Sequence, residues 1–286
     1  MKNPIIAELE KLKIIDQKNR SIIGIIKKNK TKVLLDKKSG LIYIEKYLHK
    51  LKDYQFNRNY SQQDILKYKK LLLKDDKRRF RQFKDTLKNR KILDFGCEYG
   101  GFLENINNSK KLYGFEINHS CIKFLKKNLK KINLVKNLDK NKIKFDIITM
   151  FHVLEHMPFQ VGILKQLRSN LEKNGKIIIE VPSGSDFLLS LKELTSFKDF
   201  TFWNEHLILY TKETLIKILK LSGFKNIKLI NFQRYDLNNH LGWFLTGKPN
   251  GHEIFKNIYD TKLKKAYIDY LDRTNQTDTL IAIADK

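Results

Sequence analysis

A cluster of histidines and a glutamate lies in the middle of the chain, in the segment FHVLEHMP (151–158). His152, Glu155 and His156 follow the spacing His-x-x-Glu-His, which on a helix places two imidazoles and a carboxylate on one face, as zinc-dependent proteolysis requires. Pro158 follows His156 by two residues, and a proline interrupts the long helix that such a zinc site needs. Zinc proteolysis is therefore disfavoured, and the chemistry of these side chains depends on what surrounds them.

A glycine-rich turn follows the first convincing buried strand, in ILDFGCEYGGFL (92–103). Asp94 ends the strand, and the turn into the next helix is bracketed by Gly96, Gly100 and Gly101. Such a turn lets backbone N–H groups approach an anionic or zwitterionic ligand. The dinucleotide fingerprint Gly-x-Gly-x-x-Gly is incomplete, because Glu98 stands in place of its middle glycine.

A carboxylate ends the next predicted strand, KLYGFEI (111–117). Glu116 follows Asp94 by 22 residues, which is the spacing at which an acidic side chain receives ribose hydroxyls. A glycine turn alone is a weak signal. Together with the helix, this acid and the later strand KFDIITMF (144–151), it predicts a site for a nucleoside-containing cofactor.

Strands and helices alternate from Lys91 onward. The predicted strands span 91–96, 111–117, 132–137, 144–151, 176–182, 226–235 and 279–286, and the predicted helices span 100–108, 119–131, 158–174 and 211–224. This order implies an α/β fold, a doubly wound and mostly parallel seven-stranded sheet with helices on both faces. Gly175 is expected to close the third helix, and the last strand to add an antiparallel partner at the sheet edge.

The front of the chain reads as a small α+β cap of residues 1–88, followed by a main domain of residues 89–286. Two short strands are expected in KVLLDKKSGLIYIEKY (32–47) around a turn, and a long helix in 61–89 with Ser61 as its N-cap. Two insertions interrupt the main domain, at about 183–210 and 236–277.

Four groups of segments give the chain its resemblance to class I S-adenosylmethionine-dependent methyltransferases, over about residues 91–286. They are ILDFGCEYGG, YGFEI, FDIITMFHVLEHMP, and LEKNGKIIIEVP with the later HLILYT and LSGF. Members of that family often carry Val-Leu-Glu-His after the fourth strand, so HVLEHMP is expected here without zinc. The resemblance implies a Rossmann-like methyltransferase fold and S-adenosyl-L-methionine as the cofactor.

The resemblance also implies roles for matched positions: the glycine loop holds the methionine moiety, the acid after strand two binds ribose, the turn after strand three lies near adenine, and the end of strand four lines the methyl-transfer cavity. The implied cofactor-binding residues are Asp94, Gly96, Cys97, Glu98, Gly100, Glu116, Ile117, Asn137, Leu138, Met150 and Phe151. Glu98 departs from the glycine usual in the family, and its carboxylate either contacts the amino group of the methionine moiety or crowds the pocket.

Histidines near the expected transfer point are candidate bases, because an imidazole with a pKa of about 6.5 can remove a proton from a hydroxyl acceptor. His156 is the first candidate and His206, in NEHLILY, the second, with Glu155 and His152 beside them. The alternative is that Glu155 and His156 only fix their loop, and that His206 is a packing residue. No metal is predicted, although Glu155, His156 and His206 could gather around an ion.

The segment QRYDLNNHLGWFLTGKPNGH (233–252) suits a sugar or nucleotide acceptor, because it combines stacking rings with hydrogen-bond donors and cations for a phosphate. It is similar to a segment of methyltransferase-like proteins associated with bacterial surface-polysaccharide synthesis. The candidate substrate-binding residues are Arg234, Tyr235, Asn239, His240, Trp243, Lys248 and His252. The alternative is a structural lid or a dimer contact, and a homodimer is possible.

The net charge of +26 invites a nucleic-acid interpretation, but only nine of the 57 basic residues are arginine, so 48 are lysine. Arginine is the better ligand for phosphates and bases. Abundant lysine, asparagine and isoleucine also follow from an A+T-rich coding sequence. Nucleic acid is therefore an unlikely partner, and the charge favours a solvated surface, with an anionic partner as the alternative.

The two cysteines, Cys97 and Cys121, form no Cys-x-x-Cys pair and suit a reducing cytoplasm. The longest apolar runs are far shorter than the roughly 20 residues that span a bilayer.

The predicted function is O-methylation of a sugar, a nucleotide-linked sugar or a related surface-polysaccharide precursor. The alternatives are an RNA or protein methyltransferase, a non-catalytic scaffold and, disfavoured by the missing glycine, an NAD oxidoreductase. MFHV in place of an NPPY-like tetrapeptide counts against base-amino and glutamine acceptors.

Overall fold

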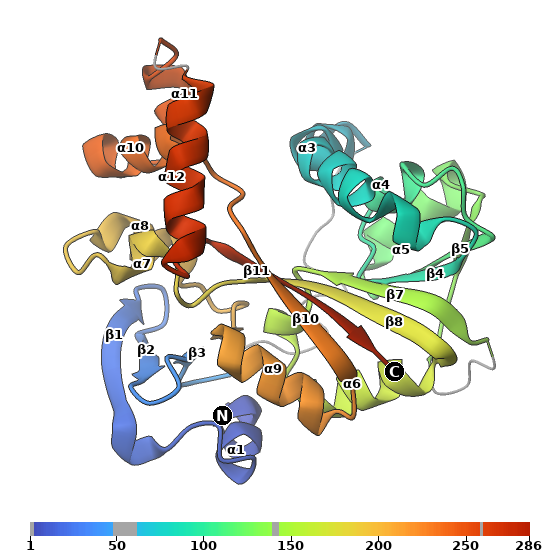
Figure 1. Cartoon of the computed structure of the whole chain (residues 1–286), viewed down its shortest axis with the longest axis horizontal. Helices are drawn as coiled ribbons and strands as arrows, with labels where there is room; N and C mark the ends of the chain where they lie inside the picture. The colour runs from blue at the N-terminus through green and yellow to red at the C-terminus, as the bar shows by residue number, and fades with distance from the viewer. Residues whose placement is uncertain (1–2, 48–61, 139–142, 258–259) are drawn as a thin grey trace.

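Two sheets and the helices packed on them make up the fold (Figure 1). The structure is a computed structural model that describes residues 3–47, 62–138, 143–257 and 260–286. A seven-stranded sheet has the order β10-β11-β8-β7-β4-β5-β6, and a four-stranded sheet has the order β1-β2-β3-β9. The predicted α/β fold with seven strands is confirmed.

The strands of the large sheet are β4 (Lys91–Phe95), β5 (Lys111–Phe115), β6 (Ile132–Leu134), β7 (Phe145–Phe151), β8 (Leu171–Pro182), β10 (Lys225–Phe232) and β11 (Thr279–Asp285). The five from β6 to β8 are parallel, and β11 is antiparallel to both β8 and β10. The prediction that the last strand forms the edge was wrong. β11 is apolar and almost entirely buried, whereas β10 carries exposed lysines, so the more polar strand takes the edge.

Helices cover both faces of the large sheet, with α3, α4 and α5 on one side and α6 and α9 on the other (Figure 1). Their bounds are α3 Gln62–Leu87, α4 Gly101–Glu104, α5 His119–Asn128, α6 Gln160–Ser169 and α9 Lys212–Leu221. Ile178 packs into the core beneath α3, and its neighbours Ile177 and Ile179 pack into the opposite core. This alternation is the period of two that a strand buried on both faces must show.

Helix α6 ends earlier than predicted, at Ser169, and Gly175 lies inside β8 rather than closing the helix. Leu171 is fully buried and pairs with Phe145 of β7, so the residues after Ser169 already belong to the sheet. The burial of Leu171 outweighs the helix propensity of the polar residues that follow it.

The N-terminal section contains α1 (Pro4–Lys11), a 3-10 turn η1 (Gln17–Asn19), β1 (Arg20–Ile26), β2 (Thr31–Asp36) and β3 (Ile42–Ile44). The predicted hairpin corresponds to β2 and β3, and the predicted long helix to α3. Ser61, its predicted N-cap, lies outside the described residues. Strand β3 also pairs with β9 (Ile208–Leu209) from the first insertion, so the section shares a sheet and a core with the rest of the chain.

The insertions supply α7 (Phe187–Ser190), α8 (Thr195–Thr201), α10 (Leu237–Thr246), α11 (Gly251–Ile254) and α12 (Thr261–Arg273). Figure 1 shows them gathered beyond one end of the large sheet, away from α4 and α5. Among the helices in the described part of the chain, none combines the length and apolar character needed to cross a membrane.

Candidate active site

One cavity of about 1280 Å³ runs from the turn after β4 to the inserted helices. We call its two parts the glycine-loop end, lined by Asp94, Gly96, Cys97, Glu98, Glu116 and Leu138, and the histidine end, lined by His152, His156, Trp203, His206, Arg234 and Tyr235. The carboxyl ends of parallel strands meet along one sheet edge, which is the usual place for a ligand in this architecture.

Asp94 anchors the glycine-loop end. It is almost fully buried at the end of β4, and its Oδ1 accepts a hydrogen bond of 2.7 Å from the hydroxyl of Thr149 on neighbouring β7. Burial raises the pKa of Asp94 to about 7, against the opposing effect of that hydrogen bond. Asp94 therefore fixes the start of the loop. Because its pKa is close to 7, a cation bound nearby would favour the ionised form of its carboxyl group.

Glu116 ties the loop to the end of β5. Its Oε2 accepts the backbone N–H of Glu98 at 2.9 Å, and its Oε1 accepts those of Ile117 and Asn118, each at 2.7 Å. Three backbone N–H groups therefore fix the position of the Glu116 carboxylate.

The loop itself requires glycine at position 96. Gly96 has a φ of 80°, and a Cβ there would lie 2.5 Å from Cγ2 of Val153, so only glycine fits.

Glu98 is held to the wall of the cavity by helix α3. Its backbone is left-handed, with a φ of 44°, and its Oε1 accepts a hydrogen bond of 3.3 Å from the hydroxyl of Tyr68. Glu98 lines the cavity together with its neighbours Cys97 and Tyr99. The carboxylate at this position therefore belongs to the pocket wall.

The structure brings nine of the eleven predicted cofactor residues to the cavity wall: Asp94, Gly96, Cys97, Glu98, Glu116, Ile117, Asn137, Leu138 and Phe151. Met150 is a correction, because it is fully buried in the core on the opposite face of β7 from Phe151. Gly100 is the second correction, because it is the N-cap of α4 and lies against Leu125 and Leu129 instead of lining the cavity. Cys97 is a buried packing residue, and burial raises the pKa of its thiol.

Helix α3 adds residues that sequence reasoning missed, since Tyr68, Lys69, Asp76 and Arg79 also line the cavity. Asp76 Oδ2 lies only 2.2 Å from where a Cβ of Gly101 would be, so that glycine lets the helix approach the loop. Burial raises the pKa of Asp76 to about 6. In the sequence, the Arg78-Arg79 pair could have indicated that this helix contributes to the site, because arginine is rare in the chain.

What we call the ionic cluster is formed by Asp75, Arg78, Arg79, His152, Glu180 and Arg234, and it shares His152 and Arg234 with the histidine end. Glu180 is fully buried and accepts hydrogen bonds from Arg78 at 2.7 and 2.9 Å and from Arg79 at 2.7 and 3.2 Å. Burial alone would raise the pKa of Glu180, but the hydrogen bond from His152 and the guanidinium groups hold it well below its usual range. Arg234 pairs with Asp75 at 2.5 Å.

His152 is locked inside this cluster. Its Nδ1 lies 3.2 Å from Glu155 Oε1, and its Nε2 lies 3.2 Å from Glu180 Oε1 and also 3.2 Å from Arg234 NH1. Its backbone is left-handed, with a φ of 53°. Both ring nitrogens are therefore engaged by charged neighbours, which hold the ring of His152 in place.

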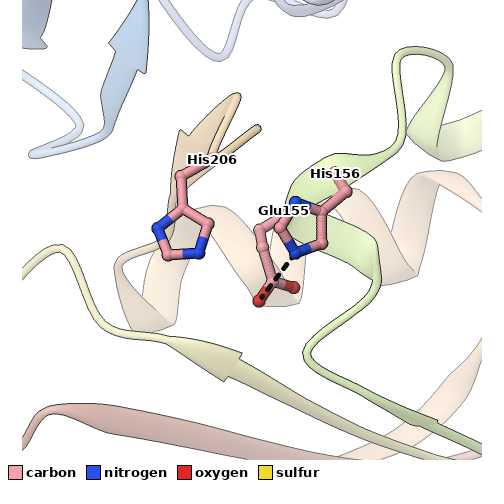
Figure 2. A group of neighbouring side chains, drawn as sticks. All are labelled: Glu155, His156 and His206. Carbon is pink, nitrogen blue, oxygen red and sulfur yellow. Dashed lines mark ion pairs between the residues drawn. The ribbon is translucent and has the colours of Figure 1, made fainter. Parts of the chain in front are cut away.

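Glu155, His156 and His206 converge at the histidine end, although His206 is 50 residues from His156 (Figure 2). The two imidazole centroids are 5.2 Å apart, and His156 Nε2 lies 3.9 Å from Glu155 Oε1. Leu154–His156 forms only a short 3-10 turn, η2, so the long helix of a zinc protease is absent from this described segment. Burial, together with the neighbouring imidazole of His156, lowers the pKa of His206 to about 3, which keeps the His206 imidazole neutral.

Six of the seven predicted substrate-binding residues line the cavity: Arg234, Tyr235, Asn239, His240, Trp243 and His252. Lys248 is exposed and outside the cavity wall, which corrects its predicted role. His240 is nearly fully buried, hydrogen-bonds the hydroxyl of Tyr267 at 2.7 Å, and has its pKa lowered by burial to about 4. Trp243 packs edge-on against Phe197, with 5.1 Å between the ring centroids, and this contact joins α10 to α8.

Known proteins show the family to which this fold and cavity belong. A sequence profile described as a methyltransferase domain matches residues 64–229, which is more than half of the chain. A tRNA U34 carboxymethyltransferase of Aliarcobacter butzleri is 29% identical over 162 residues, covering 51% of this chain and 50% of the relative. The chain thus spans about half the length of the curated relatives it matches.

Solved structures agree on the fold. A phosphoethanolamine N-methyltransferase 2 of Haemonchus contortus in complex with S-adenosyl-L-methionine superposes with a TM-score of 0.53 at 15% identity, covering 86% of this chain and 63% of that one. A possible histamine N-methyltransferase of Thermotoga maritima superposes with a TM-score of 0.50 at 16% identity, covering 78% and 95%. At these identities the likeness is one of fold, and it confirms the predicted Rossmann-like methyltransferase fold.

Proposed function

This chain belongs to the methyltransferase-domain family and uses S-adenosylmethionine, and we propose that its acceptor is a hydroxyl group of a sugar, a nucleotide-linked sugar or a related surface-polysaccharide precursor. The observation that carries the proposal is the pair of imidazoles, His156 and His206, at the end of the cavity opposite the glycine loop. A hydroxyl acceptor must lose a proton as it is methylated, whereas a neutral amine need not lose one before it reacts.

The residues of the glycine-loop end fit S-adenosylmethionine. The cofactor supplies a methyl group on a positively charged sulfur, so its transfer depends mainly on alignment. Glu116 would bind the ribose, because its carboxylate is preset by three backbone N–H groups and lines the cavity. Ile117 and Leu138 offer apolar surface for adenine, and the Glu98 carboxylate offers a partner for the amino group of the methionine moiety.

The histidine end would receive the acceptor. As the acceptor oxygen bonds the methyl carbon, the carbon–sulfur bond breaks with its electron pair going to sulfur, and the hydroxyl proton must leave. Glu155, His156 and His206, which we call the triad, are the groups of the histidine end that would ease the loss of that proton. Trp203 is partly exposed beside His206, with ring centroids 4.7 Å apart, and offers a face on which a sugar can stack.

Transfer of a labelled methyl group tests this function. The full chain is incubated with methyl-labelled S-adenosylmethionine and, separately, with a set of nucleotide sugars and with unmodified tRNA. Label is expected in a nucleotide-sugar product, and Glu116→Ala should strongly reduce it. Label found only in RNA would overturn the sugar proposal while leaving the methyltransferase intact.

An RNA acceptor is the second candidate, because the curated relative from Aliarcobacter butzleri is named for tRNA modification. The net charge of +26 is compatible with it. The comparisons give no support to the prediction that nucleic acid is an unlikely partner, so the tRNA arm of the experiment carries equal weight. Cytoplasmic location, a possible homodimer and the division at residue 88 stay predictions.

A further inference from the structure

The triad has the composition and spacing of a metal site. One ligand atom from each of Glu155, His156 and His206 lies within 4.8 Å of the other two. Metal–nitrogen and metal–oxygen bonds of about 2.0–2.2 Å place ligand atoms roughly 3–4 Å apart around one ion. Side-chain rotations that close the group by about 1 Å or less would therefore complete the coordination.

Both imidazoles are oriented by backbone carbonyls. His156 Nδ1 donates to the carbonyl of Glu205 at 2.6 Å, and His206 Nδ1 donates to the carbonyl of Thr201 at 3.2 Å. Metal-binding histidines commonly donate their second ring N–H in this way, which fixes the tautomer and aims the other nitrogen at the ion. The loop from Thr201 to His206 thus supplies one ligand and orients both.

A second observation comes from the carboxylate. Glu155 is fully buried, and its Oε2 has no hydrogen-bond partner among the residues that the structure describes. A buried carboxylate oxygen without a donor is costly unless a cation or water compensates it. A backbone hydrogen bond from Leu207 N to the carbonyl oxygen of Glu155, at 3.0 Å, joins the segment of Glu155 and His156 to the residue after His206.

We propose that Glu155, His156 and His206 bind one divalent transition-metal ion at the histidine end of the cavity. The ligand set is not the His-x-x-Glu-His motif of the sequence. His152 is excluded because its ring is held between Glu180 and the Arg234 cation, and His206 takes its place from a distant segment. Two imidazoles and one carboxylate favour zinc or iron(II) over magnesium or calcium, which prefer oxygen ligands.

An ion at this position would be reachable from the cavity, because His156 and His206 both line it. It would polarise an acceptor hydroxyl and ease the loss of its proton. This role rests on the proposed methyl transfer, whereas binding of the ion does not.

Zinc titration of the metal-free full chain, followed by calorimetry, tests the site. One zinc ion per chain is expected, and His206→Ala should weaken binding at least a hundredfold, about 2.7 kcal/mol. Glu155→Gln should weaken it at least about tenfold. His119→Ala, which removes an exposed imidazole outside the cavity, is the matched control and should bind zinc as the wild type does.

Two further readouts separate the possible failures. Cobalt(II) added to the wild type should give visible absorption bands that His206→Ala abolishes, and each variant should still bind S-adenosylhomocysteine, which reports on folding. Absence of zinc binding by the wild type, or equal binding by folded His206→Ala and Glu155→Gln, would overturn the site. Zinc binding without methyl transfer to any acceptor would instead remove the proposed function and leave the site standing.

Discussion

The two ends of the cavity are built in different ways. At the glycine-loop end, consecutive strand, turn and helix segments position backbone N–H groups and one preset carboxylate, Glu116. In the ionic cluster and at the histidine end, side chains from α3, η2, β8, the segment after β10 and the insertions meet, and the charged groups of the cluster hold one another. The first end needs a local backbone conformation, and the second needs the whole chain to be folded.

This difference has a consequence for function. A site made of backbone groups tolerates substitution around it, so the cofactor end can remain the same while the acceptor end varies. The ionic cluster borders the histidine end, and its Arg79 lines the cavity with its guanidinium buried against Glu180. Changes at one end should therefore be separable from changes at the other, and four variants test this.

The largest effect is expected for Glu180→Ala, which leaves Arg78 and Arg79 buried without their carboxylate. Removing one partner of a buried ion pair costs about 3–5 kcal/mol in the free energy of unfolding. Urea unfolding followed by circular dichroism measures it. Glu172→Ala in the same strand is the control, since its side chain is 44% exposed and its loss should cost about 0.5 kcal/mol or less. Equal effects of the two variants would contradict a cluster held together by charge.

Asp76→Asn tests the junction between α3 and the glycine loop. Burial raises the folded-state pKa of Asp76 from 3.8 to about 6, so the folded protein binds this proton more tightly than the unfolded chain. Wild-type stability should therefore fall as pH rises from about 4 to 6, and the variant should lack that component. At about 1.4 kcal/mol per pKa unit, the variant gains at most about 3 kcal/mol at pH 7.

Unfolding curves at several pH values provide the comparison for Asp76, with Asp85→Asn on the exposed side of the same helix as the matched control. Parallel stability profiles for the wild type and Asp76→Asn would show that this carboxyl group is not raised in the folded state.

Glu116→Ala tests the glycine-loop end alone. Loss of the ribose acid should weaken S-adenosylhomocysteine binding tenfold or more, about 1.4 kcal/mol, when measured by calorimetry. Zinc binding at the triad should stay unchanged, because the Glu116 carboxylate accepts the backbone N–H groups of Glu98, Ile117 and Asn118 at the other end of the cavity. A parallel loss of zinc binding would mean that the two ends are coupled.

The smallest effect is expected for Lys248→Ala. Its side chain is exposed and outside the cavity wall, so stability should change by less than about 0.5 kcal/mol and the KM for the acceptor by less than about twofold. A large rise in KM would return Lys248 to the acceptor site and extend the histidine end outward.

Sequence periodicity and turn chemistry predicted the strands β4, β5, β7 and β8 and the helices between them, apart from the boundary between α6 and β8, because these signals act over a few residues. The same locality made Asp94, Gly96 and Glu116 predictable, since each follows directly from where a strand ends. Met150 failed for a related reason: within one strand, neighbouring side chains face opposite cores, and the fold decides which core faces the cavity.

Only the tertiary structure decided the partners that lie far apart in the chain. Arg78 and Arg79 meet Glu180 across about 100 residues, and His206 replaces His152 beside Glu155, although the sequence motif suggests the reverse. Buried charges must find compensating charges wherever the packing brings them, and that constraint leaves no regular spacing in the sequence. The same physics placed β11 between β8 and β10, since the strand with both faces apolar belongs inside the sheet.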